Sequence, residues 1–434
     1  MTHITTDTYR QSWRITTASV LVVLLGVVLF NSVALTNIAM LGLVLVSPFA
    51  WREFAQSNRS LELTSKVFFG LVLALCVWDV LTNLMGGNAL GAALSALLHD
   101  MRNLGFVVLL WAVFSSSRVA RLAFWAVCAV VVVMTSINLA MTLIGLVPQG
   151  EYFTTGRWHL SHMSHMYGQA LVGFVFVLAQ MWLVRPSLSW RVSVPIILLL
   201  ASLFLASERR TGWVLFLAGA VVWGLLNAKR LWMSKYKWLL VFAAVGVVGV
   251  MAGSDVVHRR MAKAVTEFSQ FLAMTPQERS ASMLGSVSIR MQYVATVMEA
   301  IRNSNWWVGM GSINLPQAYQ AAATSAGVTP QVWATYNWSN PHNEYLYMLA
   351  TKGVVGLVLY LAIFAQACRV AWGKKDEVQR IGLVMFVFLF MLSITTNSMM
   401  IDMEEGHFTM LILLIFLAPK SLDLIQRPSE TTRI

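Results

Sequence analysis

Residues 341–371 read PHNEYLYMLATKGVVGLVLYLAIFAQACRVA, a short polar element followed by a long apolar run. An α-helix needs about 20 predominantly apolar residues to cross the hydrocarbon core of a bilayer. The run at 344–371 is long enough, so we expect a transmembrane helix that begins directly after the polar element. Apolar runs of similar length recur on both sides of it.

The composition is that of a membrane protein. Hydrophobic residues make up 58% of the chain, charged residues only 12%, and the mean hydropathy is +0.68. A soluble core could not bury this much apolar surface. We predict an all-α, polytopic integral membrane protein with about 12 transmembrane helices, and a re-entrant or interfacial helix at 88–98. The expected transmembrane helices are at 15–31, 33–50, 65–85, 103–117, 119–147, 165–184, 192–207, 212–227, 236–252, 344–371, 379–397 and 406–424.

Lysines and arginines indicate the orientation in the membrane. With both termini cytoplasmic, about 20 of the 31 basic residues fall in cytoplasmic segments, as the positive-inside rule requires. The net charge of +12 is then explained by orientation and by anionic lipid, and it predicts no nucleic-acid partner. The first apolar run has no small-residue cleavage site after it, so we expect a retained helix and not a signal peptide.

The longest polar interruption, at 253–343, divides a single membrane domain. Residues 1–252 would form transmembrane helices 1 to 9, and residues 344–434 would form helices 10 to 12 and a short cytoplasmic tail. The interruption itself would be a large periplasmic loop carrying amphipathic helices. Apolar residues in its first part share one helical face, which is typical of a helix that lies on the bilayer surface. They are Val257, Met261, Val265, Phe268 and Leu272.

A second helix of this loop is expected from Ser286 to Ile301, with Arg290 in its first turn. A cation at this position opposes the helix dipole, so helix stability does not explain it. An anion held jointly by Arg290 and by exposed backbone amides would explain it. The alternative is an arginine that pairs with an acidic side chain or caps a neighbouring carbonyl.

Two adjacent arginines occupy a predicted tight outer turn, Ser207-Glu208-Arg209-Arg210-Thr211-Gly212-Trp213. Because adjacent side chains cannot both face the same way, one can pair with Glu208 and leave the other for phosphate. A guanidinium group suits a planar, bidentate contact with phosphate. Snorkelling to the membrane interface is the alternative explanation for one of the two arginines.

His342 lies in the polar element, directly before the tenth predicted span. A neutral imidazole can accept a proton from a hydroxyl group. Pro341 would fix the path of the chain, and Asn343, Glu344 or Tyr345 could hold the ring in one tautomer. The alternative is a structural, hydrogen-bonded histidine, and the three arginines of the same outer region favour a catalytic base over it.

Other polar residues are weaker candidates. Arg157 and His165 are candidates for contact with sugar or phosphate. With His159 and His162, His165 raises the question of zinc, but this spacing spreads the rings around a helix and no carboxylate or thiolate lies nearby. We therefore predict no metal site. An acidic segment before the last span is either a solvated turn or a contact with the acceptor: Asp402, Glu404, Glu405 and His407. A local charged cluster is expected from His99, Asp100 and Arg102.

These motifs, in this order and spacing, resemble the O-antigen ligase and polymerase superfamily of bacterial inner-membrane glycosyltransferases. The resemblance is strong over residues 195–365. Arg210 matches the arginine of a family turn that opens a helix, whereas Arg209 replaces the usual small residue. Arg290 matches a later arginine that precedes a Gly-x-Gly turn, here Gly309-Met310-Gly311. A His-Asn-x-x-Leu element and an internal helix glycine are matched by His342-Asn343-Glu344-Tyr345-Leu346 and by Gly353-Val354-Val355-Gly356.

The resemblance implies glycosyl transfer at the periplasmic face of the inner membrane. The donor would be a polysaccharide on undecaprenyl diphosphate, and the acceptor would be a sugar hydroxyl of lipid A-core in lipopolysaccharide assembly. His342 would be the general base, while Arg210, Arg290 and Arg209 would bind the diphosphate. Since arginines can replace a divalent cation here, we expect metal-independent direct displacement that inverts the anomeric carbon and uses no cofactor.

Three other functions are compatible with these residues. An O-antigen polymerase would use a second lipid-linked glycan as acceptor, and the concentration of the long loop in one place favours the ligase over it. A protein O-oligosaccharyltransferase usually has a substantial extra soluble region. A lipid or sugar transporter would place ionisable residues near the bilayer midplane, where Asp79 is the main candidate.

Overall fold

The computed structural model describes most of the chain: residues 6–30, 32–56, 62–145, 164–185, 189–206, 210–235, 255–275, 286–325, 341–393 and 403–422, with isolated residues at 245–246, 249, 252–253, 278 and 424. Every regular element over these residues is a helix. The all-α prediction is confirmed for this part of the chain.

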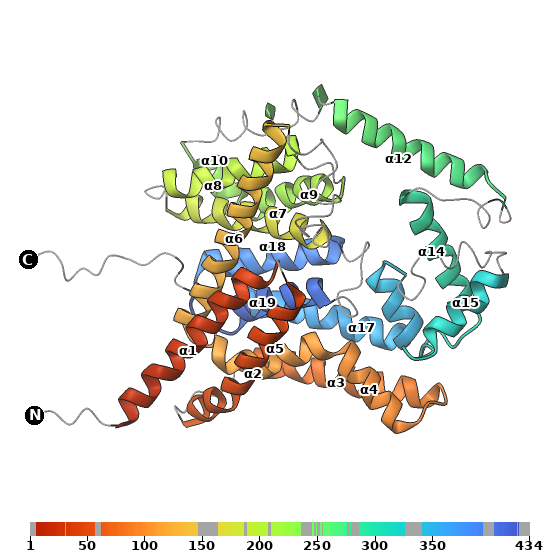
Figure 1. Cartoon of the computed structure of the whole chain (residues 1–434), viewed down its shortest axis with the longest axis horizontal. Coiled ribbons are helices and arrows are strands. Elements are labelled where there is room, and N and C mark those ends of the chain that lie inside the picture. The colour runs from red at the N-terminus through yellow and green to blue at the C-terminus, as the bar shows by residue number, and fades with distance from the viewer. Residues whose placement is uncertain are drawn as a thin grey trace, which may run out of the picture.

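The first six helices form one side of the bundle (Figure 1). Long runs of apolar residues with few breakers build them, and α1 packs on α2 and α6, while α2 packs on α5. Their bounds are α1 (Thr6–Val28), α2 (Val33–Gln56), α3 (Leu63–Met85), α4 (Leu90–Asp100), α5 (Arg102–Phe114) and α6 (Ser117–Leu143). The apolar stretch at 88–98 becomes α4, which meets α5 at a bend of 65°. This bent pair is either a broken span or a re-entrant loop, in keeping with the re-entrant helix expected there.

The middle of the chain forms a second group of helices, in which α7 packs on α8 and α9. Their bounds are α7 (Ser164–Val184), α8 (Ser189–Ala201), the π-helix η3 (Ser202–Ala206), α9 (Arg210–Leu226) and α10 (Ala228–Met233). The π-helical turn continues α8 and ends just before the paired arginines. Short π-helical turns occur frequently at functional sites.

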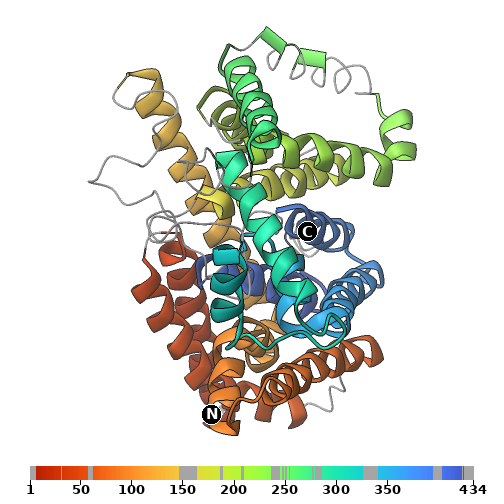
Figure 2. The same ribbon diagram turned by 90° about the vertical axis from the view of Figure 1, so that its right-hand side faces the viewer.

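Three helices of the long interruption curve beside the bundle (Figures 1 and 2): α12 (Asp255–Ala273), α14 (Ser286–Arg302) and α15 (Leu315–Ser325). The predicted amphipathic helix is confirmed as α12. Its apolar face is exposed: Met261, Val265, Phe268 and Leu272 are 47–62% exposed. Its other side meets α14, against which Glu267 and Phe271 are buried.

The last three helices complete the core: α17 (Glu344–Trp372), α18 (Glu377–Ser393) and α19 (Met403–Leu417). Residues 405–417 of α19 are buried on all sides by α5, α6, α7, α17 and α18. A helix that is apolar all round is typical of such a central position. One expectation is wrong in detail: the run at 344–371 is not one continuous helix, because Gly353 has φ 63° and ψ −170° and interrupts it.

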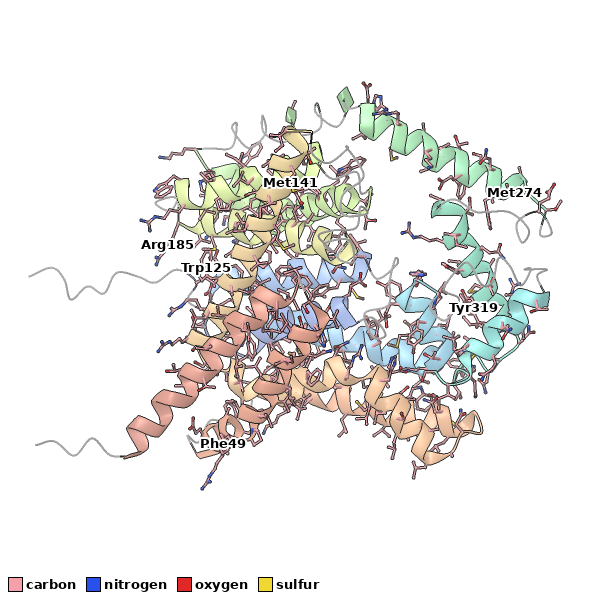
Figure 3. The ribbon with its side chains drawn as sticks, in the orientation of Figure 1. Phe49, Trp125, Met141, Arg185, Met274 and Tyr319 are labelled. Carbon is pink, nitrogen blue, oxygen red and sulfur yellow. The ribbon has the colours of Figure 1, made fainter. Side chains whose placement is uncertain are left out.

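The membrane class is supported by length and composition. Among the described residues, four helices are long and apolar enough to cross a bilayer, α2, α3, α6 and α17, and the bent pair α4–α5 makes up to five. Outer side chains such as Phe49 and Trp125 project away from the bundle (Figure 3), as lipid-facing residues do. The count of about 12 spans stays a prediction, and the expected span at 236–252 lies almost entirely outside the described residues.

Candidate active site

The start of α17 places His342 in an unusual backbone conformation. Its φ is +49°, in the left-handed region that few residues other than glycine adopt. The next residue, Asn343, caps the helix, because its Oδ1 accepts a hydrogen bond of 3.0 Å from the amide of Leu346. Residues held in such conformations cluster at active sites and ligand clamps, which makes His342 a structural as well as a sequence candidate.

The ring of His342 stacks on Tyr293 of α14, with ring centroids 5.0 Å apart and an interplanar angle of 29°. Tyr293 is buried, and its main-chain oxygen accepts a 2.8 Å hydrogen bond from the hydroxyl of Tyr319 in α15. Burial raises the pKa of Tyr319, so this hydroxyl stays protonated and remains a donor. The candidate base therefore rests on a platform built by α14 and α15. Sequence reasoning placed Tyr293 on this helix but assigned it no role.

Arg290 precedes Tyr293 by three residues in α14, so the two side chains share one face of the helix. The face that stacks on His342 thus also carries the candidate diphosphate ligand, which is half-buried. This geometry connects two of the residues that the sequence singled out separately.

The expectation for the amides at the start of α14 needs a correction. The amide of Val287 donates to Oε2 of Glu267 at 2.9 Å, and the Ser288 hydroxyl donates to the main-chain oxygen of Glu267 at 3.0 Å. A carboxylate from α12 thus occupies an amide that we expected to bind an external anion. An anion at this site would be held by the guanidinium group of Arg290 and not by that amide.

The helix α9 begins inside the predicted segment 207–213, whose first three residues lie outside the described part of the chain. Arg210 is the first residue of α9, directly after η3 and a three-residue connection. The indole Nε1 of the buried Trp213 donates to the main-chain oxygen of Leu203 at 3.0 Å and links α9 to η3. The side chain of Arg210 and the whole of Arg209 lie outside the described residues.

The residues expected to orient the imidazole instead fix the start of α17, the helix that follows His342. Besides the cap formed by Asn343, the hydroxyl of Tyr345 donates to the main-chain oxygen of Met391 in α18 at 2.6 Å. Glu344 is completely buried. These contacts set the position of the first turn of α17, and through it the position of His342.

The Gly-x-Gly turn docks into the interruption of α17. The amides of Met310 and Gly311 donate to the carbonyls of Ala350 and Thr351, both at 2.9 Å. In the other direction, the amide of Val354 donates to the carbonyl of Trp306 at 3.0 Å. A Cβ atom on Gly353 would lie 2.2 Å from the carbonyl oxygen of Trp307, so only glycine fits. The backbone groups that the helix break leaves open are thus satisfied by the turn.

The remaining candidates are placed only in part. Arg157 lies outside the described residues, and so do the side chain of His165 and the whole of Asp402. The solvated turn expected before the last span is wrong for Glu405 and His407, which are buried in α19 because this helix packs at the centre of the bundle. Over the described residues, no three His, Cys, Asp or Glu side chains group as a metal site would need. Metal independence stays a prediction.

One part of the chain matches a known protein family. Residues 195–361 match the family model described as O-antigen ligase. The match extends from α8 into α17 and contains Arg209, Arg210, Arg290 and His342. No curated protein matches the chain. Members of this family are membrane glycosyltransferases that use lipid-linked glycans and lipid acceptors. Residues 195–361 are therefore similar to the O-antigen ligase family, which confirms the resemblance indicated by the sequence motifs.

Proposed function

We propose that the protein is an O-antigen ligase that transfers a polysaccharide from undecaprenyl diphosphate to a sugar hydroxyl of lipid A-core. The observation that carries this proposal is the stacking of His342 on Tyr293, because it joins the candidate base to the helix that carries Arg290. The family match over residues 195–361, which contains both residues, supports the same reaction class.

The chemistry is a single displacement at the anomeric carbon. The acceptor oxygen forms a bond to this carbon while the ring of His342 takes the hydroxyl proton. The bond from the anomeric carbon to the diphosphate oxygen breaks, and its electron pair leaves with the diphosphate. Attack opposite the leaving group inverts the configuration. Substitution of such a base typically costs about 10²- to 10⁴-fold in rate.

The leaving diphosphate is stabilised by Arg290, Arg210 and Arg209. Guanidinium groups donate two parallel hydrogen bonds to phosphate oxygens and keep their charge at any working pH. Preorganised cations of this kind act where negative charge develops in the transition state. They replace a divalent metal ion, so the reaction proceeds in a chelator. Arg157 and His165 are additional candidates for contact with the glycan.

We place this site at the periplasmic face of the inner membrane, with both termini cytoplasmic. The exposed apolar face of α12 supports a position of this helix on the bilayer surface, next to α14. A base and cations at that depth would meet the diphosphate of a lipid-linked donor, whose polyprenyl chain stays in the bilayer.

The test is transfer by the reconstituted protein in the presence of EDTA, with lipid-diphosphate-linked glycan and purified lipid A-core. We expect product from the wild type and a rate at least about 100-fold lower from His342→Ala. His258→Ala, at an exposed histidine of α12, is the matched control and should retain wild-type transfer. Full transfer by His342→Ala would remove His342 from the mechanism.

An O-antigen polymerase is the second candidate, because the family match fits both reactions equally well. The same assay separates them. A polymerase would lengthen the lipid-linked donor and leave lipid A-core unmodified. That result would replace the acceptor in the proposal but keep the roles of His342 and the arginines.

A further inference from the structure

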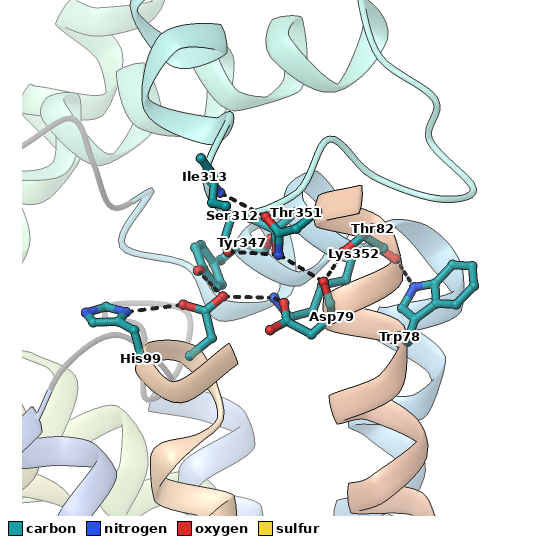
Figure 4. Close-up of polar contacts among 11 residues, drawn as sticks. Trp78, Asp79, Thr82, His99, Ser312, Ile313, Tyr347, Thr351 and Lys352 are labelled. Atoms are coloured by element: carbon teal, nitrogen blue, oxygen red, sulfur yellow. Dashed lines mark hydrogen bonds and ion pairs between the residues drawn. The ribbon is translucent and has the colours of Figure 1, made fainter. Parts of the chain in front are cut away.

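A completely buried lysine lies at the interruption of α17. The ammonium group of Lys352 is 2.5 Å from Oδ1 of Asp79 in α3 and 3.1 Å from Oδ2 of Asp100 at the end of α4 (Figure 4). All three side chains are buried. Three separate helices, two of them at a bend or break, therefore meet at one ionic cluster.

The cluster contains one lysine and two aspartates. One ammonium group faces two carboxylates, and removing a buried charge partner leaves the others uncompensated. Two neighbours add contacts to Asp100: the Tyr347 hydroxyl donates to its Oδ2, and Nδ1 of His99 lies near its Oδ1, both at 3.2 Å. Lys352 is thus the cation on which the charge balance of the cluster depends.

The same residues hold the Gly-x-Gly turn. Lys352 directly follows Ala350 and Thr351, whose carbonyls accept the amides of the turn, and its own carbonyl accepts a 2.7 Å hydrogen bond from Trp78 of α3. The turn is also attached to α3, because the amide of Ile313 donates to Oδ1 of Asn83 at 3.2 Å. Figure 4 shows Trp78 and Ile313 beside Asp79 and Lys352 of the ionic cluster.

Because of the helix break, the position of His342 depends on these contacts. Because Gly353 interrupts α17, the segment 344–352 is not held in line by continuous helical hydrogen bonds with the rest of the helix. Its position depends on lateral contacts, and Lys352 is its last residue. At its other end the segment begins two residues after His342. The turn leads back to α14, which carries Tyr293 and Arg290.

We propose that Lys352, held by Asp79 and Asp100, is a positioning residue that locks the segment 344–352 and the turn at 306–311 together and thereby sets His342 against α14. The catalytic part of this inference rests on the proposed function, while the structural part does not. Misplacement of a reacting group by about 1 Å can cost 10²-fold in rate.

The test uses the full chain in lipid nanodiscs, with hydrogen exchange and transfer kinetics measured on the same samples. In Lys352→Met we expect the amides of residues 306–311 to exchange at least about tenfold faster. The value of kcat should fall about 100-fold, with the KM for the lipid-linked donor nearly unchanged. Asp79→Asn should change both readouts far less, because Lys352 then keeps one carboxylate partner.

The matched control is Lys374→Met, the same substitution at a second buried lysine just beyond the other end of α17. It should leave the exchange at 306–311 and kcat at wild-type values. Wild-type exchange and kcat in Lys352→Met would overturn the proposal. Wild-type protein without transfer activity would instead overturn the proposed function, while the exchange data would still test the positioning of the turn.

A triple variant separates positioning from simple stability. Lys352→Met with Asp79→Leu and Asp100→Leu removes all three charges as a unit, a change that is often neutral for stability. We expect it to fold even if Lys352→Met alone does not. It should keep fast exchange at 306–311 and a kcat at least about tenfold below wild type, because the lateral link is lost. Full recovery of both readouts would reduce the cluster to a stability element and overturn the proposal.

Discussion

One buried lysine lies at the interruption near the start of α17 and another lies just beyond its end, but their partners differ. Lys352 faces the carboxylates of Asp79 and Asp100. Lys374, just past the other end, donates to the main-chain oxygens of Leu417 at 2.9 Å and Pro419 at 2.8 Å. A neutral amine can still donate to carbonyls, whereas only a cation balances two carboxylates. The function of Lys352 therefore depends on its charge, and that of Lys374 does not.

The backbone conformation also differs between the two ends of α17. The first end contains His342 with φ +49° and Gly353 with φ +63°, and a turn from another part of the chain docks into it. The other end continues as regular helix to Trp372 and stops at Gly373 with ordinary helical angles. Strained backbone persists only where its surroundings over-determine it, and such places are often functional. The comparison thus favours the first end as the place of the proposed site.

The substitution Gly353→Ala should cause the largest loss of transfer activity, because it changes the end of α17 that holds the docked turn. A Cβ atom at this positive φ would meet the carbonyl oxygen of Trp307 at 2.2 Å, so the turn must move away from α17. We expect a loss of transfer greater than about 100-fold, by the argument that reacting groups tolerate little displacement. The measurement is kcat in nanodiscs, together with hydrogen exchange of residues 306–311.

Gly373→Ala is the control at the other end of the helix. Its Cβ would be 3.5 Å from the nearest atom, the oxygen of Val370, and its φ is negative, so transfer should stay within about twofold of wild type. Equal losses at both glycines would mean that helix integrity, and not the docked turn, determines activity.

A smaller effect is expected from Tyr293→Leu, which removes the ring on which His342 stacks. Aromatic contacts of this kind contribute about 0.5–1.5 kcal/mol, which corresponds to a loss in kcat of up to about tenfold. Tyr293→Phe keeps the ring and should retain nearly full activity. If Phe and Leu reduce kcat to the same extent, the stacking contact does not position the base.

Much of the fold could be predicted because the length of an apolar run fixes a membrane helix. The expected spans at 65–85 and 344–371 nearly coincide with α3 and α17. The interruption at Gly353 could not be found in this way, because it depends on backbone groups supplied by residues 306–311. A glycine inside an apolar run carries no signal of what docks against it.

The residues of the candidate site that stand in visible motifs could be predicted, whereas contacts between distant parts of the chain could not. His342 and Arg290 stand in polar segments where a motif is visible, and the stacking on Tyr293 brings their segments together. The partners of Lys352 lie more than 250 positions away in sequence, so its ionic contacts could not be assigned. One signal was available: Asp79 and Lys352 have opposite charges within two predicted spans, and ionisable residues in spans usually pair.

The smallest effect on activity is expected from Lys374→Met, which should change stability alone. Burial lowers the pKa of Lys374 to about 8, from the usual 10.5, and the carboxylate of Glu62 only partly opposes this. Between these two values the unfolded chain binds more protons than the folded one, so the free energy of unfolding should rise with pH. Below pH 8 both states are protonated, and this contribution is constant.

The methionine variant lacks this titration, so the stability difference between wild type and variant should widen as pH rises from 8 to 10.5. At pH 7 the variant should be less stable by about 1 kcal/mol, because the carbonyls of Leu417 and Pro419 lose a donor, while Gln379 still donates to that of Pro419. Unfolding curves in mixed micelles at several pH values measure both quantities. Parallel curves for the two proteins would show that Lys374 stays charged, and the contrast with Lys352 would then rest on backbone geometry alone.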